Sequence, residues 1–424
     1  MSRYYRPFAL LLLPLLVACG GDETATTTTA PPASETTTVA QSSPSAPVGE
    51  DPTEEEMERE RFDDAWKDLD SINEARERER QPAETPSDTA SSSTFAQRGE
   101  RTESLDGISI ETARNAPVLL PIRGDVSGPS VLKTQVYLDH ADFSPGVIDG
   151  RWGKNTAIAV YWFQHANGLN PTGEIDRDTF TILEQAASIG ASLTRYSVSK
   201  ADLEGQFVEI PDDPYEKADL DCLCYESVIE KLAETFHTTP DFLSKLNEGT
   251  DFSALREGQQ IVVPNAPTHR SSGNVSRIVI SVEGNYLHGM DGNRNIVFHY
   301  PTTVGSKYDP SPSQELEVTA IAWDPTFHYQ PKLFHEVSDE KPDVVMQPGP
   351  NSPVGIVWMQ LSKENYGIHG TAAPSTIGYT SSHGCIRLTN WDARELGHAV
   401  DEGATVVFTD PRRAAPGAKL KIEN

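Results

Sequence analysis

The sequence has little cysteine and few positive charges. Only 4 of its 424 residues are cysteine, and 35 Lys and Arg stand against 63 Asp and Glu, for a formal net charge of −28. Such a surface repels nucleic acid and anionic headgroups, so no nucleic acid partner is expected. The length allows two or three domains, but with 37% hydrophobic residues and 31 prolines a substantial part is not expected to pack.

A short apolar run follows two arginines at the N-terminus. Arg3 and Arg6 precede the run from Phe8 to Val17, which is too short to span a bilayer as a helix and predicts a secretory signal. Leu16-Val17-Ala18-Cys19 resembles the lipobox of bacterial lipoproteins. The resemblance implies cleavage before Cys19 and a diacylglycerol on its sulfur, and two or more acyl chains anchor a protein stably to a membrane.

The expected location follows from this lipobox. In that family Gly20 after the cysteine, rather than Asp, implies the periplasmic face of the outer membrane if the cell is Gram-negative, and otherwise the cell envelope. The alternative is an ordinary signal peptide with an incidental cysteine.

Export leaves three cysteines in an oxidising compartment, so at least one thiol is free unless it pairs with another chain. Cys222 and Cys224 are two residues apart, and a bridge between such close neighbours needs strained geometry. We therefore predict that they are small core residues beside Leu223. Cys385 is then the thiol that needs a function.

Residues 20–115 are rich in Thr, Ser and Pro and then in charge, which predicts a disordered linker. A partner-binding helix near Phe62 and Trp66 is the alternative to a solvated tether.

Order returns near Ser130. The pattern from Thr156 to His165 predicts a helix after a glycine-marked turn. The region resembles the small helical peptidoglycan-binding domain, whose motif residues here are Ile148-Asp149-Gly150, Gly153, Thr156, Ala159-Val160, Phe163-Gln164 and Gly168-Leu169.

The next segment predicts two helices and a strand. Ser227 and Thr239 are the expected helix caps, and "QQIVVPN" is the expected strand, which Pro264 ends. This order resembles the LysM glycan-binding module. The module's usual opening, a short strand followed by Gly-Asp, is not expected, because Tyr196 to Ile210 and a long insertion stand in its place.

From Val275 the apolar residues alternate with period two, which predicts β-strands. "TNWDARELGHAVDEG" predicts one helix, with Thr389 or Asn390 as its cap and Gly403 as its stop. The expected class is a mostly-β sandwich or barrel-like sheet with one helix. The segment from Asp324 to Pro353 is too long for a plain turn, and such a loop covers a site or is disordered.

Two histidine-bearing segments lie in this β region, "YGIHGT" and "SSHGCIRL". His369 and Cys385 are 385 − 369 = 16 residues apart, enough for a loop that brings one strand back beside another. A thiol becomes a good nucleophile when a base favours its thiolate, and an imidazole is such a base if another group fixes its tautomer. Neither motif contains a carboxylate, so we expect a backbone carbonyl to orient the imidazole.

These motifs resemble the catalytic signature of the YkuD-type L,D-transpeptidases. The resemblance implies that Cys385 is the nucleophile, His369 the general base and Gly370 the carbonyl that orients it. It also implies an oxyanion hole from the amides of His383, Gly384 and Cys385, with His383 lining the pocket. Candidate substrate-binding residues are Arg387, Ser382 and Tyr366.

The alternatives to this site are a structural Cys-His pair and a zinc site made by Cys385, His383 and His369. No zinc-ligand spacing supports the metal, so neither a metal nor a cofactor is expected.

These inferences divide the chain into six predicted parts. They are a lipoprotein signal peptide at 1–19, the linker at 20–115, a peptidoglycan-binding domain at 116–190, a LysM-like module at 191–268, the L,D-transpeptidase catalytic domain at 272–412 and a tail at 413–424.

The resemblance implies acyl transfer on peptidoglycan stem peptides, giving 3→3 cross-links or attaching a protein to the wall. Expected partners are peptidoglycan glycan and stem peptides, the membrane through lipidated Cys19, and a wall-attached protein as a further acyl acceptor. The rival functions are a carboxypeptidase or hydrolase that uses the same site, and a non-catalytic lipid-anchored tether.

Overall fold

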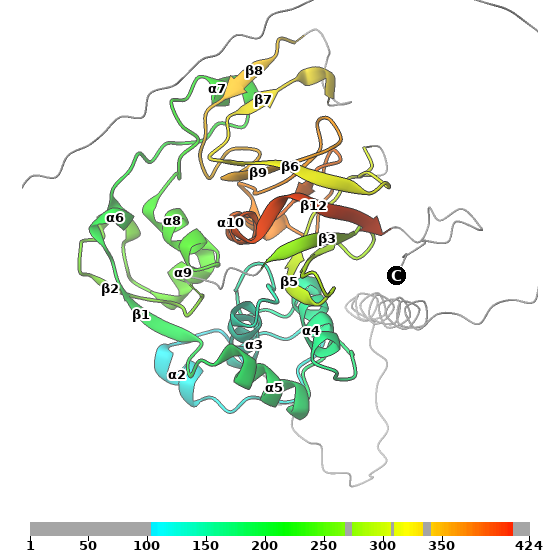
Figure 1. The fold of residues 1–424 in the computed structure, drawn as a ribbon. Helices are drawn as coiled ribbons and strands as arrows, with labels where there is room; N and C mark the ends of the chain where they lie inside the picture. Colours follow the sequence, from blue (N-terminus) through cyan, green and yellow to red (C-terminus); the bar gives the residue numbers. More distant parts are fainter. Residues whose placement is uncertain (1–102, 268–273, 307–308, 334–340, 410–424) are drawn as a thin grey trace, which may run out of the picture. The chain divides into compact units, whose positions relative to one another are not determined.

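The computed structural model describes residues 103–267, 274–306, 309–333 and 341–409. They form a helical region, a small α+β region and a β-rich region, in chain order (Figure 1). The predicted signal peptide with Cys19, the linker up to residue 102 and the tail lie outside the described residues, as does His335. The predicted end of the linker at residue 115 is wrong, because Leu105, Ile108 and Ala113 are buried in the core of the helical region.

The first region is helical, as the peptidoglycan-binding resemblance implies. The predicted helix is confirmed, although it begins at Lys154 with Gly153 as N-cap. Two buried glutamines stabilise the turns: Gln135 Oε1 accepts from the N–H of Gly150 at 2.7 Å, and Gln164 Oε1 accepts from that of Gly173 at 2.9 Å. The helices are α2 (Ile110–Asn115), α3 (Pro129–His140), α4 (Lys154–Ala166) and α5 (Arg177–Ala187).

The second region is a two-stranded sheet with helices between its strands. Ser227 and Thr239 cap helices as predicted. The expected absence of an opening strand is wrong, since Leu193–Ser197 pairs antiparallel with Gln260–Pro264. The strand was missed because it is short and only Leu193 in it is buried. The elements are β1 (Leu193–Ser197), α6 (Lys200–Leu203), α7 (Pro214–Ala218), α8 (Val228–Thr235), α9 (Pro240–Leu246), the 3₁₀ turn η1 (Phe252–Ala254) and β2 (Gln260–Pro264).

A disulfide joins Cys222 to Cys224, so the prediction that these are small core residues is wrong. Both are only half-buried, whereas Leu223 between them is fully buried and packs with Tyr329 and Met346. The central leucine supplies the apolar contact, and the sulfurs on either side of it bond to each other. Cys385 is the free cysteine of the described residues.

The third region is one mixed sheet of eight strands, in the order β11-β10-β9-β6-β12-β3-β4-β5. Pairing is parallel between β12 and β3 and between β10 and β11, and antiparallel elsewhere. The strands are β3 (Val275–Ser281), β4 (Tyr286–Met290), β5 (Ile296–Pro301), β6 (Leu316–Trp323), β9 (Val357–Leu361), β10 (Gly367–His369), β11 (Ile386–Arg387) and β12 (Val400–Thr409).

One helix, α10 (Asn390–Ala399), packs on this sheet through Ala393 and Leu396 (Figure 1). The predicted mostly-β region with a single helix is confirmed. Thr389 is the cap, since its side chain accepts from the N–H of Asp392 at 3.1 Å. The predicted stop at Gly403 is wrong: the helix ends at Ala399, and Gly403 lies within β12.

The long segment from Asp324 to Pro353 contains regular structure. Strands β7 (Phe327–Tyr329) and β8 (Val344–Met346) form an antiparallel pair, and the 3₁₀ turn η2 (Pro331–Leu333) follows β7. Tyr329 and Met346 pack on Leu223 beside the disulfide. The described part of this segment is therefore anchored to the second region.

The three regions belong to one compact unit of the chain, residues 85–424. They meet at a buried histidine. His237 Nδ1 lies 2.8 Å from Oδ2 of the fully buried Asp139 on α3. The imidazole also stacks on Trp391 of α10, with 5.0 Å between ring centroids and 8° between planes. Each region thus contributes one of these side chains.

We predict that Asp139→Ala lowers the free energy of unfolding. It leaves the buried His237 nitrogen without its carboxylate, and an unpaired buried polar group costs about 1–3 kcal/mol. Chemical denaturation measures the loss. The matched variant Asp178→Ala changes an exposed residue of α5 and should stay within about 0.5 kcal/mol of wild type. If both variants were equally stable, the Asp139–His237 contact would not stabilise the packing of the three regions.

Candidate active site

Parallel pairing of β10 with β11 brings the two predicted catalytic residues together. Ile368 lies opposite Ile386, and His369 opposite Arg387. Since side chains alternate along a strand, His369 and Arg387 share one face of the sheet. Cys385 directly precedes β11, two residues before Arg387. The charge of Arg387 acts on both His369 and Cys385, so the three residues gather at this edge of the sheet.

His369 is held in one tautomer. Its Nδ1 lies 2.7 Å from the carbonyl oxygen of Gly370, and because a carbonyl can only accept, Nδ1 carries the proton. Trp358 on β9 stacks on the ring, with 5.4 Å between centroids and 23° between planes. The carbonyl contact expected of Gly370 is present, and the lone pair of Nε2 remains for a proton from the reaction.

Burial and the charge of Arg387 act on His369 in the same direction. Burial of the ring, and then the guanidinium, lower the pKa of His369 to about 3, while the hydrogen bond to Gly370 opposes them. The imidazole is therefore neutral in the resting protein and is able to accept a proton.

The thiol of Cys385 is uncharged at rest. Burial raises its pKa, and a backbone hydrogen bond with Gly367 and the charge of Arg387 lower it by less. The sulfur lies 3.6 Å from the carbonyl oxygen of Asn365, an acceptor that favours the protonated thiol. The resting pair is thus a thiol and a neutral imidazole, and the proton must move during attack.

Arg387 is a positive charge with unused donors. Its Nε is buried and makes no hydrogen bond to any described residue, and burial lowers the pKa of the guanidinium. Of the salt bridges found between described residues, none involves Arg387. A half-buried cation without a carboxylate partner among the described residues suits an anionic group supplied by a ligand.

Ser382 stabilises the turn that carries the cysteine. Its hydroxyl donates to the carbonyl of Cys385 at 2.5 Å and accepts from the N–H of Gly384 at 3.2 Å. Ser382 was predicted to bind substrate, but its hydroxyl is buried and used within the turn. The N–H of Gly384 was predicted to line an oxyanion hole, but in this structure it is directed to Ser382.

Tyr366 packs directly on this turn. Gly384 has φ +105°, and a Cβ there would lie 2.9 Å from Cε1 of the Tyr366 ring. Glycine is therefore required for both its backbone conformation and its close contact. Lys363 Nζ lies 3.9 Å from the ring centroid on Tyr366. The aromatic ring thus covers the loop beside the nucleophile.

Asn390, predicted only as a possible helix cap, supports the segment after His369. Its Oδ1 accepts from the N–H of Thr371 at 3.1 Å, and its Nδ2 donates to Glu234 Oε2 at 2.9 Å and to the carbonyl of Pro350 at 3.1 Å. A Cβ on Gly370 would lie 2.2 Å from this Oδ1. The buried amide therefore fixes the carbonyl-bearing residue that orients the base.

Sequence reasoning missed Trp358 and the role of Asn390. Trp358 occupies a half-buried position in an alternating strand, where tryptophan is ordinary, so only the cross-strand register identifies it. The partners of Asn390 come from residues 234, 350 and 371, which are close only after folding.

In the part of the chain described here, no group of three or more His, Cys, Asp and Glu residues is arranged to hold a metal ion. Cys385, His383 and His369, the alternative zinc ligands, are therefore not arranged as a metal site among the described residues.

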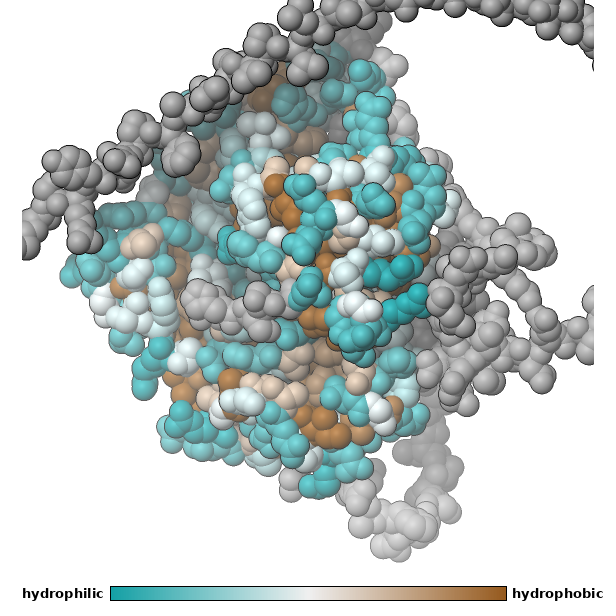
Figure 2. Space-filling model, in the orientation of Figure 1, coloured by the Kyte–Doolittle hydropathy of each residue, from teal (hydrophilic) through white to brown (hydrophobic). Residues whose placement is uncertain are grey.

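No helix among the described residues is both long and apolar enough to cross a membrane. The face shown in Figure 2 carries mostly hydrophilic side chains, with smaller hydrophobic areas between them.

Comparison with known proteins shows which family the chain resembles. The model of the YkuD L,D-transpeptidase catalytic domain matches residues 276–408. The YkuD protein of Bacillus licheniformis is 32% identical over 182 residues, which are 43% of this chain and 93% of that protein. The chain belongs to the YkuD family of L,D-transpeptidases.

A second relative carries the same family name. YkuD of Bacillus subtilis is 28% identical over 42% of this chain and 92% of its own length. A solved structure of an L,D-transpeptidase from Xylanimonas cellulosilytica is 16% identical with a TM-score of 0.32, covering 69% of this chain and 99% of that one. The peptidoglycan binding domain model matches residues 127–183. The predictions of a YkuD-family enzyme and of a peptidoglycan-binding domain are confirmed.

We predict that alkylation of Cys385 by iodoacetamide accelerates with pH and has its midpoint above the ordinary cysteine value of about 8.5. The thiolate reacts, and burial raises the pKa of this thiol. Arg387→Gln should move the midpoint higher still, because the guanidinium favours the thiolate. Mass spectrometry of the labelled protein gives the rate.

The control for this profile is Arg277→Gln, which removes a cation paired with Glu315 in the same sheet and should leave the midpoint unchanged. A midpoint near pH 6 in the wild type would mean that the resting pair is a thiolate and an imidazolium. That result would contradict the neutral thiol and neutral imidazole described above.

We predict that Asn390→Ala destabilises the protein by about 2–3 kcal/mol, because it removes the acceptor of a buried N–H. It should also slow acylation of Cys385 roughly 10-fold or more by displacing the residue that orients His369. The control Asn295→Ala changes an exposed amide. Loss of stability at a wild-type acylation rate would separate Asn390 from the catalytic loop.

Proposed function

We propose that this protein transfers acyl groups between peptidoglycan stem peptides through a thioester on Cys385, forming 3→3 cross-links. The observation that carries the proposal is that β10–β11 pairing brings His369 opposite Arg387, two residues after Cys385 in the chain, and that the charge of Arg387 acts on both His369 and Cys385. The membership of the YkuD family supports the same reaction class.

In the first half-reaction the proton of the Cys385 thiol moves to Nε2 of His369 as sulfur attacks the carbonyl of the L-centre third residue of a stem peptide. The tetrahedral oxyanion collapses, the bond to D-alanine breaks, and the imidazolium returns its proton to the departing amine. The amides of His383 and Cys385 are the proposed oxyanion donors. The neutral state of His369 supports its role as base.

In the second half-reaction the side-chain amine of another stem attacks the thioester. His369 takes a proton from that amine, the carbon–sulfur bond breaks, and Cys385 recovers its thiol. The guanidinium of Arg387, which has donors to spare, would bind a carboxylate of the stem peptide. Tyr366 would line the same site beside Gly384.

The other parts of the chain would keep the enzyme at its substrate. The domain at 127–183 would hold glycan, and tethering raises the local concentration of substrate. The β1-α8-α9-β2 order supports a LysM-like module as a second glycan-binding part. Lipidation of Cys19 would anchor the exported protein, with the linker giving it reach from membrane to wall.

We predict that the wild type forms a stable adduct with a carbapenem and that Cys385→Ala forms none. His369→Gln should acylate roughly 10²–10⁴-fold more slowly, since it removes the base. Intact-protein mass spectrometry follows the adduct. If the folded, reduced wild type formed no adduct, the proposed acyl transfer through Cys385 would be wrong. A non-catalytic, lipid-anchored tether would then be the better proposal.

The acyl acceptor is tested with a purified disaccharide tetrapeptide. A cross-linked dimer with release of D-alanine supports transpeptidation. A tripeptide alone would instead show that water is the acceptor and that the protein is a carboxypeptidase or hydrolase. Transfer only to an added wall protein would make attachment of protein its function.

A further inference from the structure

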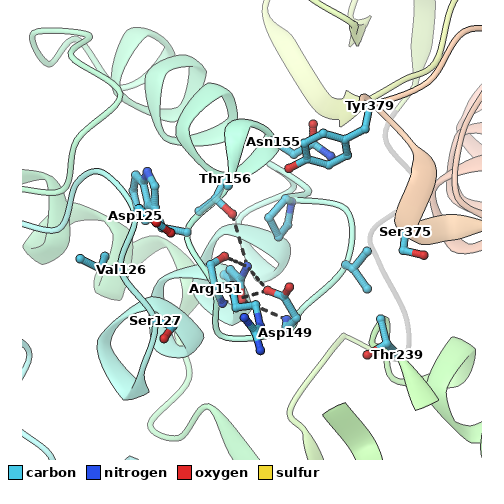
Figure 3. Close-up of a pocket in the computed structure, with 15 residues that line it drawn as sticks. Asp125, Val126, Ser127, Asp149, Arg151, Asn155, Thr156, Thr239, Ser375 and Tyr379 are labelled. Atoms are coloured by element: carbon cyan, nitrogen blue, oxygen red, sulfur yellow. Dashed lines mark hydrogen bonds between the residues drawn. The ribbon is translucent and has the colours of Figure 1, made fainter. Parts of the chain in front are cut away.

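A cavity of about 360 Å³ lies where the helical region meets segment 374–380 of the catalytic domain (Figure 3). Its volume is within the roughly 300–1,000 Å³ of ligand pockets. Ser127 lies on one side, Ser375 and Tyr379 on the opposite side, and Asp149 and Arg151 between them. The cavity therefore lies between the peptidoglycan-binding and catalytic domains, and Thr239 of the second region adds to its wall.

Segment 374–380 is attached to the peptidoglycan-binding domain at the start of α4. Asn155 Nδ2 donates to the carbonyl of Ile377 at 2.9 Å. The N-cap of α4, Gly153, has no capping side chain, and a Cβ there would lie 2.7 Å from the Tyr379 hydroxyl. Burial raises the pKa of Tyr379, and the backbone N–H groups of Asn155 and Lys154 oppose this shift. A side chain of the catalytic domain thus lies against the N-terminus of this helix.

The same segment leads to the catalytic cysteine. It joins β10, which ends at His369, to the turn before β11. The N–H of Gly378 donates to Thr303 Oγ1 at 3.1 Å, and the main chain of Thr303 pairs with that of Arg387 at 2.9 and 3.0 Å. The cavity wall is therefore two hydrogen-bonded steps from the strand that follows Cys385.

The chemistry of the lining suits a sugar. Both hydrogen bonds to Asp149 end on Oδ1, which leaves Oδ2 without a partner among the described residues. This oxygen can accept from a ligand hydroxyl, and the exposed guanidinium of Arg151 can donate to an amide carbonyl. Tyr379 is 59% exposed, so its ring can pack on the apolar face of a pyranose. Ser127 and Ser375 add hydroxyls that both donate and accept.

We propose that this cavity binds an N-acetylated amino sugar of the peptidoglycan glycan strand, which contacts Asp149 and Arg151 of one domain and Ser375 and Tyr379 of the other. The inference rests on the proposed function, because it takes the substrate to be peptidoglycan. A glycan bound here holds segment 374–380 against the peptidoglycan-binding domain and so restricts the loop before Cys385. The glycan-binding domain then acts on the catalytic loop directly, in addition to tethering.

Binding is tested by isothermal titration of the full chain with the tetramer of N-acetylglucosamine, which contains no stem peptide. Arg151→Ala and Tyr379→Ala should each weaken binding at least 10-fold. The matched controls are Arg123→Ala, an exposed arginine paired with Glu174 in the same domain, and Trp323→Ala, an exposed aromatic residue of β6 in the catalytic domain. Neither control should change the affinity more than twofold.

Hydrogen exchange distinguishes loss of glycan binding from unfolding of the variant. In wild type the tetramer should slow exchange in residues 374–380, and in Arg151→Ala it should not, while exchange in the sheet strands stays equal in both proteins. Equal affinities in all variants, or no protection of segment 374–380, would overturn the inference.

The two proposals fail separately. A wild type that cross-links the disaccharide tetrapeptide but does not bind the tetramer keeps the proposed function and overturns the glycan site. A wild type that binds the tetramer with protection of segment 374–380, but forms neither adduct nor cross-link, keeps the glycan site and overturns the proposed function.

Discussion

The catalytic arrangement depends on the parallel pairing of two very short strands. The β10–β11 register puts His369 opposite Arg387, and Cys385 directly precedes β11, so the charge of Arg387 acts on both His369 and Cys385. A one-residue shift in this pairing would turn the histidine to the other face of the sheet. Much of the surrounding structure holds this register: Trp358 packs on the imidazole, and the main chain of Thr303 pairs with Arg387 on its other side.

A second level of support comes from outside the catalytic domain. Asn390 connects the residues after His369 to Glu234 of α8 and to Pro350. The residue Asn351 in turn bonds to the carbonyl of Cys224 at 2.9 Å, next to the disulfide. Hydrogen bonds thus connect the second region to the segment that orients the base.

Electrostatics at the site follow from burial. Burial lowers the pKa of His369 and raises that of Cys385, so both are neutral before substrate arrives. A neutral pair avoids the cost of burying two charges. Arg387 retains the positive charge that favours the thiolate as it forms. The arrangement suits a nucleophile that is activated during attack.

The sequence by itself determined the local elements and the candidate reacting groups. Period-two alternation, the Thr389 cap and the motifs at His369 and Cys385 are written in adjacent residues, and short-range steric and capping preferences are enough to interpret them. Tertiary structure decided the rest. The Cys222–Cys224 bridge, the β7–β8 pair and the use of the Ser382 hydroxyl within its own turn depend on where the main chain bends. The stacking of Trp358 on His369 joins residues 369 − 358 = 11 positions apart, and the bond of Asn390 to Glu234 joins residues 390 − 234 = 156 positions apart. The cavity brings together Asp125 and Tyr379, which are 379 − 125 = 254 positions apart. Such contacts carry no local pattern, because their partners become neighbours only when the chain has folded.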